Sequence, residues 1–165
     1  MGYNWKQFTR RISIAAPPKA IYEAWTTQQG LESWFLRLAQ FTKADGTTRP
    51  KNSPIEQGDR YHWLWHGYED SVFEENEILS VNGWDKLQFS FSGKCIVTVT
   101  IKQLNGETIC ELIQDIPYET LEDQQFYFVD CGLGWAFYLV NLKSVLEGGL
   151  DLRNKNEKLK EVVNA

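Results

Sequence analysis

The feature that most constrains the fold is an apolar segment near the C-terminus, residues 131–149 (CGLGWAFYLVNLKSVLEGG). Its apolar residues recur at intervals of three and four, which predicts a helix with one broad apolar face. That face carries Cys131, Trp135, Tyr138, Leu139, Leu142, Val145 and Leu146, and Asn141, Lys143, Ser144 and Glu147 fall on the opposite side. Asp130 can cap the start of this helix, and Gly148 can end it in a left-handed turn. The other long apolar runs alternate like strands, so we expect the helix to lie across a sheet.

Strand-like alternation of apolar and polar residues fills most of the remaining chain. It occurs in segments 7–16, 59–66, 71–81, 86–91, 94–104 and 107–116. Asn82-Gly83 and Asn105-Gly106 are strong hairpin signals between consecutive segments. We therefore expect an antiparallel sheet of about six strands, the last five of which follow one another as a meander.

The last hairpin allows its register to be predicted. If Asn105-Gly106 forms a two-residue loop, apolar residues meet across one face of the two strands. The predicted pairs are Ile101 with Cys110, Val99 with Leu112 and Val97 with Gln114, and Ile78 should lie opposite Leu87 or Phe89 on the preceding pair. Gln114 is the one polar member of this face.

Two short helices and two irregular segments complete the chain. Residues 19–27 and 31–38 each place aromatic and aliphatic residues at helical spacing, after Pro17 and Pro18 end the first strand. Residues 39–58 are rich in Thr, Pro, Gly and charge, which predicts a long loop; we favour a mobile surface segment over the alternative, a functional flap. Residues 153–165 form a charged tail that we expect to be solvated. Neither side of the long loop can stand alone, so the whole chain, residues 1–165, is expected to form one domain.

The resulting order is one strand, two short helices, a meander of strands and one long helix. A strongly twisted antiparallel sheet can close its apolar face around a single helix. This predicts an α+β fold of the helix-grip type.

Several motifs resemble a known family. The C-terminal motif contains Gly134-Trp135, Leu139, Asn141-Leu142-Lys143, Leu146-Glu147-Gly148 and Leu152. The opening motif contains Ile14-Ala15-Ala16-Pro17, Ile21-Tyr22, Ala24-Trp25-Thr26, Gly30-Leu31 and Trp34-Phe35. Two further motifs lie in the predicted strands. One is Gly58-Asp59 with Tyr61 and Trp63, and the other is Lys86-Leu87 with Phe89 and Phe91. Together they resemble the START-like (SRPBCC, Bet v 1-like) superfamily, and within it the activators of heat-shock protein 90 ATPase of the C-terminal domain type.

The resemblance carries expectations about fold and function. It implies a cavity between the sheet and the C-terminal helix, which in this superfamily holds lipids, sterols, polyketides and other apolar molecules. It also implies a possible chaperone partner in stress biology, and the superfamily includes cyclases and dehydratases that act on bulky cyclic substrates.

Composition excludes several other classes of function. A net charge of -5 and a pI near 5.1 argue against nucleic acid binding, which needs a basic surface. The sequence has no apolar run long enough to span a membrane and no N-terminal signal core. The three cysteines show no disulfide-like spacing and suit a reducing cytoplasm, where we expect the protein to reside.

Metal and nucleophile signatures are also missing. His62 and His66 share one face of a predicted strand, but four residues separate them by roughly 13 Å, too far to bind one zinc ion. Cys95, Cys110 and Cys131 have no metal-binding spacing, and the sequence holds no nucleophile motif. We expect no metal, no cofactor and no catalytic residue, and a binding function rather than an enzyme.

The chain is instead rich in aromatic residues, with seven Trp, seven Tyr and nine Phe. These rings can either pack a solid core or line a cavity. As candidate ligand-binding residues we select Trp25, Trp34, Phe35, Tyr61, Trp63, Trp65, Asn76, Phe89, Phe91, Gln114, Trp135, Tyr138, Leu139 and Leu142. Gln114, Tyr138 and either Asn76 or Glu74 are the expected polar contacts.

Three functions follow from these observations. The favoured one is binding of an apolar or aromatic small molecule between the sheet and the C-terminal helix. The first alternative is a chaperone-associated protein-interaction module, and the second is a cyclase-like or dehydratase-like enzyme. Both a monomer and a homodimer are compatible with the sequence.

Overall fold

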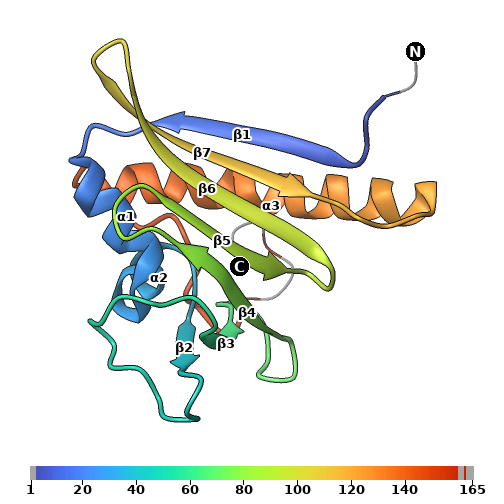
Figure 1. Ribbon diagram of the computed structural model, residues 1–165, viewed down its shortest axis with the longest axis horizontal. Coiled ribbons are helices and arrows are strands. Elements are labelled where there is room, and N and C mark those ends of the chain that lie inside the picture. Colours follow the sequence, from blue (N-terminus) through green and yellow to red (C-terminus); the bar gives the residue numbers. More distant parts are fainter. Residues whose placement is uncertain (1–2, 160–161, 163–165) are drawn as a thin grey trace.

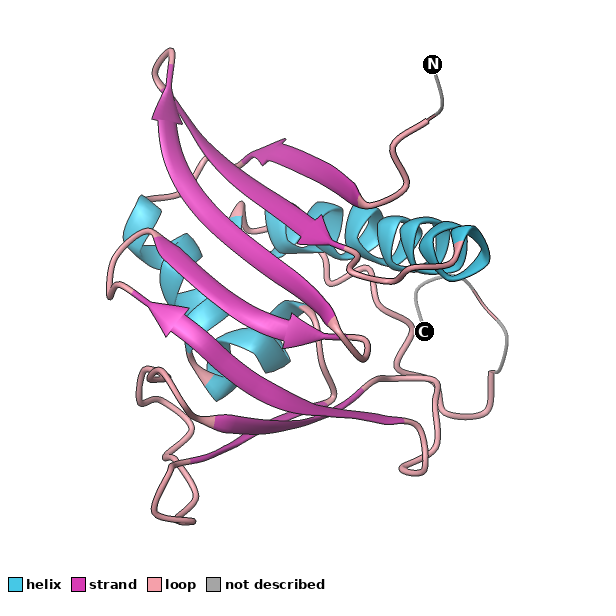
Figure 2. Cartoon of the chain, turned by 45° about the vertical axis from the view of Figure 1, so that its right-hand side comes forward, coloured by secondary structure: helices cyan, strands magenta, loops and turns pink. Residues whose placement is uncertain are grey.

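The computed structural model describes residues 3–159 and 162, and within them one antiparallel sheet packs its concave face against the helices. The strands are β1 (Gln7–Ser13), β2 (Leu38–Thr42), β3 (Arg60–Leu64), β4 (Phe73–Val81), β5 (Lys86–Phe91), β6 (Cys95–Leu104) and β7 (Glu107–Asp115). The helices are α1 (Pro18–Thr26), α2 (Gln28–Trp34) and α3 (Leu121–Leu146). The seven strands lie in the order β1-β7-β6-β5-β4-β3-β2. Figures 1 and 2 show all three helices on one face of the twisted sheet, which confirms the predicted helix-grip class.

The predicted strand registers are confirmed. Ile101 pairs with Cys110, Val99 with Leu112 and Val97 with Gln114 on β6 and β7, and Ile78 of β4 pairs with Phe89 of β5. Asn105 and Gly106 join β6 to β7 with φ angles of 52° and 84°. Both residues must adopt the left-handed region in this type of tight hairpin, which is why Asn-Gly signals it so strongly.

The long helix begins ten residues earlier than expected, because its cap is Thr120 and not Asp130. The Thr120 hydroxyl accepts a hydrogen bond from the Asp123 N–H at 3.1 Å, and the carboxylates of Glu122 and Asp123 lie at the positive end of the helix dipole. The predicted end is correct: Gly148 follows the helix with a φ of 79°. α2 also starts earlier than expected, because the Thr27 hydroxyl accepts from the Gly30 N–H.

The segment predicted as a mobile loop, residues 39–58, begins with a strand and is anchored at several later points. β2 pairs with β3, with Ala39 opposite Trp63 and Phe41 opposite Tyr61, and this adds one strand to the six that were expected. Its alternation covers only five residues, so pairing with β3 decides its structure and local sequence does not.

Farther along, the rest of this segment is tied to the sheet by a buried ion pair. Arg49 donates from Nε and Nη2 to the two carboxylate oxygens of Asp59 at 2.6 and 2.9 Å. Both residues are almost fully buried, and Ile55 packs into the core.

The C-terminal segment after α3 is docked rather than solvated as far as Arg153. The Arg153 side chain is buried and donates to the carbonyl oxygens of Leu36 and Glu32, both at 3.0 Å. Asn141, expected on the polar side of the helix, is fully buried beneath this segment. Its amide donates to the Trp34 carbonyl at 2.6 Å, and its oxygen accepts from the Leu152 N–H at 2.7 Å. Of the charged tail expected over residues 153–165, residues 160–161 and 163–165 lie outside the described residues.

The Arg49–Asp59 pair gives a first prediction. Arg49→Met leaves the Asp59 carboxylate buried without its cation, so the free energy of unfolding should fall by about 3 kcal/mol. Lys51→Met is the matched control, because Lys51 is exposed and its 3.4 Å pair with Glu32 is a surface contact. Urea denaturation of both variants measures the difference. Equal losses in the two variants would show that the buried pair does not anchor this segment.

Candidate functional site

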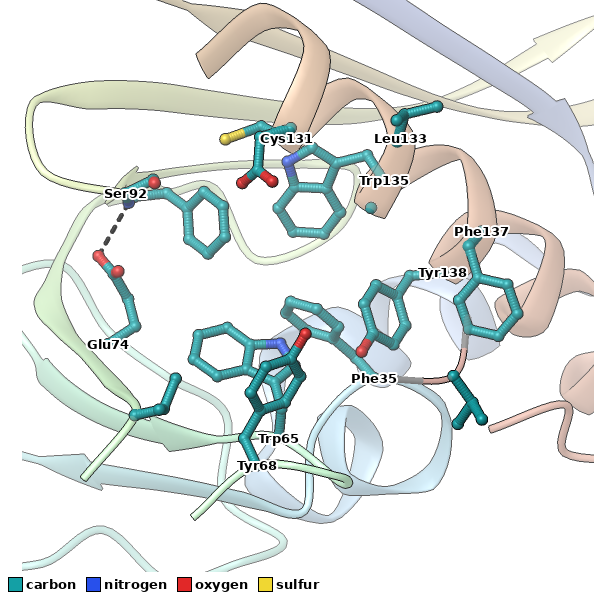
Figure 3. Close-up of a pocket in the computed structure, with 15 residues that line it drawn as sticks. Phe35, Trp65, Tyr68, Glu74, Ser92, Cys131, Leu133, Trp135, Phe137 and Tyr138 are labelled. Carbon is teal, nitrogen blue, oxygen red and sulfur yellow. Dashed lines mark hydrogen bonds between the residues drawn. The ribbon is translucent and has the colours of Figure 1, made fainter. Parts of the chain in front are cut away.

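A cavity of about 650 Å³ lies between the middle of α3, the start of β4, the end of β5 and the segment that follows β3 (Figure 3). Its floor is formed by the buried residues Phe35, Cys131, Trp135 and Tyr138. Half-buried side walls come from Trp65, Glu74, Phe91, Ser92 and Phe137. Exposed residues surround the mouth, among them Tyr68, Val72, Asp130 and Leu133. The site therefore has an apolar interior that is open to solvent.

Contacts between aromatic rings hold the floor in place. Phe35, just after α2, has its ring centroid 5.0 Å from that of Trp135 and 4.7 Å from that of Tyr138. Trp65 lies 6.3 Å from Phe35, and Phe91 lies 5.1 Å from Trp135. These separations are those of edge-to-face and tilted ring pairs, so each ring fixes its neighbours.

A hydrogen bond across the sheet–helix interface orients Trp135. Its indole Nε1 donates to Gln114 Oε1 at 2.8 Å, and both side chains are buried. Gln114 is the polar residue that the predicted register placed among apolar neighbours on β7. Its role is to accept this bond. The indole is thereby held so that other parts of its ring line the cavity.

Glu74 is a carboxylate set into the wall of this aromatic cavity. Its Oε1 accepts hydrogen bonds from the Ser92 backbone N–H at 2.8 Å and from the Asn76 amide at 3.2 Å. Burial raises the pKa of Glu74, and the hydrogen bonds from Asn76, Ser92 and Gly93 oppose part of that rise. Ser92 and Gly93 adopt positive φ angles of 50° and 77°, so the turn after β5 holds its N–H groups toward this carboxylate.

Neither histidine contributes to the cavity. His62 Nδ1 lies 2.8 Å from Glu75 on the outer face of the sheet. The pKa of His66 is lowered by burial and by the nearby Arg153, Lys155 and Arg37. Among the described residues, no group of three His, Cys, Asp or Glu side chains could hold a metal ion. Nor does any helix in the described part of the chain have the length and hydropathy to cross a membrane.

Comparison with protein families identifies the relationship. The model of the family "Activator of Hsp90 ATPase homolog 1-like protein" matches residues 15–147. The chain belongs to this family. A search of curated protein sequences finds no match. The matched region begins after β1 and runs from α1 to the end of α3, so it contains every helix and strand that contributes residues to the cavity.

Solved structures show the same fold. A crystal structure of a Staphylococcus saprophyticus protein has a TM-score of 0.69 at 16% identity and covers 89% of this chain and 96% of its own. The Aha1 dimer from Colwellia psychrerythraea scores 0.65 at 18% identity, covering 87% of this chain and 97% of that one. DynU16, a protein in the dynemicin biosynthetic locus, scores 0.67 at 21% identity, covering 91% of this chain and 50% of that one. Identities this low establish the fold alone.

In this family member the candidate residues chosen from the sequence separate into three groups. Phe35, Trp65, Phe91, Trp135 and Tyr138 line the cavity. Trp25, Trp34, Tyr61, Trp63, Phe89, Leu139 and Leu142 belong to the packed core and do not reach the cavity. Asn76 and Gln114 lie behind the wall and hold Glu74 and Trp135 by hydrogen bonds. Glu74, the alternative to Asn76, lies at the cavity itself.

Several lining residues were not selected from the sequence. Cys131 lies four residues before Trp135 and Gly134 four residues before Tyr138, so the periodicity of α3 could have identified both. Tyr68, Val72 and Ser92 lie in turns, where no periodic pattern indicates which way a side chain points. At the mouth, Asp130 was predicted as the helix cap and Leu133 falls outside the predicted apolar face.

The Trp135–Gln114 bond gives a second prediction. Trp135→Phe removes the donor and leaves Gln114 Oε1 buried without a partner, so the free energy of unfolding should fall by about 2 kcal/mol. Trp84→Phe is the matched control, because Trp84 is 68% exposed. Urea denaturation compares the two variants. A stable Trp135→Phe protein would mean that this bond does not orient the helix on the sheet.

Proposed function

We propose that the protein binds an apolar or aromatic small molecule in the cavity between its sheet and α3. The observation that supports this most directly is the cavity itself: about 650 Å³, with a floor of buried aromatic rings and a mouth open to solvent. Small-molecule sites are typically concave, mostly apolar and roughly 300–1,000 Å³ in volume, with a few polar groups. The rings of this site are already held by one another, so little ordering is needed when a ligand enters.

Gly134 offers a way to block the cavity without disturbing the fold. It lies in α3 at the cavity wall, and a Cβ built on it meets nothing within 4 Å. A larger side chain at this position would therefore extend into open space. The substitution would also remove a glycine from the helix interior, where glycine is about 1 kcal/mol less favourable than a good helix former.

A third prediction follows from this geometry. Gly134→Leu should raise the free energy of unfolding by up to about 1 kcal/mol while abolishing binding of Nile red, a neutral apolar probe. Nile red fluorescence and urea denaturation measure the two effects. Ala136→Leu is the matched control, because Ala136 is exposed on the same helix and should leave probe binding unchanged.

Native mass spectrometry of the purified protein provides an independent measurement. A retained molecule that is lost in Gly134→Leu would support the proposed function. Equal Nile red binding by the wild type and Gly134→Leu, with no retained molecule, would contradict it.

A second candidate function is contact with a chaperone of the Hsp90 class. The family to which the chain belongs is named for activation of that ATPase. The observation that favours it is an apolar stripe on the solvent side of α3, formed by Phe126, Val129, Leu133 and Val140, which are 49–70% exposed. They lie at intervals of three, four and seven, on one line along the helix. The three free, buried cysteines suit the reducing cytoplasm in which such chaperones act.

The fourth prediction tests this stripe. A double variant, Val129→Lys with Val140→Lys, changes the stripe without touching the cavity lining. If the stripe contacts a chaperone, the wild-type protein should increase the ATPase rate of a purified Hsp90, and the double variant should lose that effect. The control is Trp84→Lys with Leu104→Lys, two exposed apolar residues away from α3.

Sedimentation velocity of the same proteins separates the two possible occupants of the stripe. One structural neighbour was solved as a dimer, so a second copy of this chain is the competing partner. An unchanged ATPase rate, together with a dimer that dissociates in the double variant, would assign the stripe to self-association and contradict the chaperone contact.

A further inference from the structure

We propose that the ligand of the cavity is a cation, an aromatic or alicyclic amine whose positive charge lies against Glu74. This inference rests on the proposed binding function and names the chemical class of the ligand. It excludes fatty acids and other anionic amphiphiles as preferred occupants.

The described lining of the cavity carries acidic side chains and no basic ones. Glu74 lines its wall and Asp130 lies at its mouth, and none of the described residues that line it is Lys, Arg or His. Neither carboxylate has an ion-pair partner among the described residues, although nine other acidic side chains in the same part of the chain do: Glu23, Glu32, Glu56, Asp59, Asp70, Glu75, Glu111, Glu147 and Asp151. The interior therefore presents negative charge with no cation of its own.

Glu74 is held in place by neutral hydrogen-bond donors. Its carboxylate receives hydrogen bonds from the Ser92 N–H and the Asn76 amide, which fix its position but carry no net charge. Asn76 is itself held, because its Oδ1 accepts from the Ser90 hydroxyl at 2.7 Å. Ser92 is one of two non-glycine residues in the described chain with a positive φ, a conformation that L residues seldom adopt. Figure 3 shows the bonded pair on the side of the cavity away from Tyr138.

An incoming ligand would remove water from the Glu74 carboxylate, and the cost depends on the charge of the ligand. Half-buried in an aromatic wall, Glu74 already has a raised pKa because burial disfavours its charge. A neutral ligand would remove more water and increase that penalty, and an anion would add repulsion. A cation alone would compensate the charge that it covers.

The walls around Glu74 are aromatic. Trp65, Phe91 and Trp135 line the same cavity as Glu74, with Phe91 and Trp135 5.1 Å apart. The faces of aromatic rings attract cations, most strongly those of Trp, and the attraction grows when water is excluded. The same rings would contact the apolar body of the ligand. A bulky amine uses both properties of the site.

The fifth prediction uses three probes that share a naphthalene ring and carry one small substituent of different charge: naphthylmethylamine (cationic), naphthylmethanol (neutral) and naphthoate (anionic). Isothermal titration calorimetry at neutral pH should give the amine about tenfold higher affinity than the alcohol, with naphthoate weakest. Glu74→Gln keeps an oxygen that can accept the bonds from Ser92 and Asn76, so the fold should be retained. In this variant the amine should lose most of its advantage over the alcohol and keep only the part that the aromatic rings contribute.

Glu77→Gln is the matched control. Glu77 lies on the same strand, is exposed, and points to the opposite face of the sheet. It loses the same charge and should keep the preference for the amine. Equal binding of amine and alcohol by the wild type, or tightest binding of naphthoate, would overturn the cationic ligand while leaving the binding cavity intact. Failure of all three probes to bind would overturn both proposals.

Discussion

The contact on which the structure most depends is that of Trp135 with the sheet. This one side chain is 2% exposed, and its indole bonds to Gln114 at 2.8 Å. Its ring centroid lies 5.0–6.4 Å from the rings of Phe35, Phe91, Trp25 and Phe89. Those rings come from the segment after α2, from β5 and from α1. Trp135 therefore sets the position of α3 relative to most of the fold, and the cavity lies along its free edge.

Core and cavity in this protein are parts of one aromatic cluster. Three fully buried rings, those of Trp25, Trp63 and Phe89, contact rings that border the open space. The ring centroid of Trp63, for example, lies 6.3 Å from that of Phe91. The space remains open because small residues stand where the wall would otherwise close: Gly134 on α3 and Ser92 in the turn after β5. A packed core would place large side chains there. The open volume is thus a consequence of two small residues beside a ring cluster that is already held together.

Sequence reasoning predicted the fold well because period and turn chemistry are local signals. The Asn105-Gly106 hairpin set the register of β6 and β7, and the spacing of Trp135 and Tyr138 placed both on the inner face of α3. It failed where long-range contacts decide the structure, as in β2, which is a strand because β3 pairs with it. For the site, residue parity identified the inward face of each strand but not the depth of a residue within it. Trp63 and Phe91 were equally good candidates, and only Phe91 reaches the cavity.

The buried Asn141 shows how a residue that looks solvent-facing can control the site. Its amide bonds to the Trp34 carbonyl at 2.6 Å, and Arg153 bonds to the Leu36 carbonyl at 3.0 Å. These two bonds hold the backbone on both sides of Phe35, the ring at the centre of the cavity floor. α3 and the segment after it thus both form hydrogen bonds to residues 34–36, the stretch of chain that carries Phe35. Because buried polar groups tolerate few alternative arrangements, this joint keeps the floor rigid. The cavity owes its shape to polar bonds outside it as much as to the rings within.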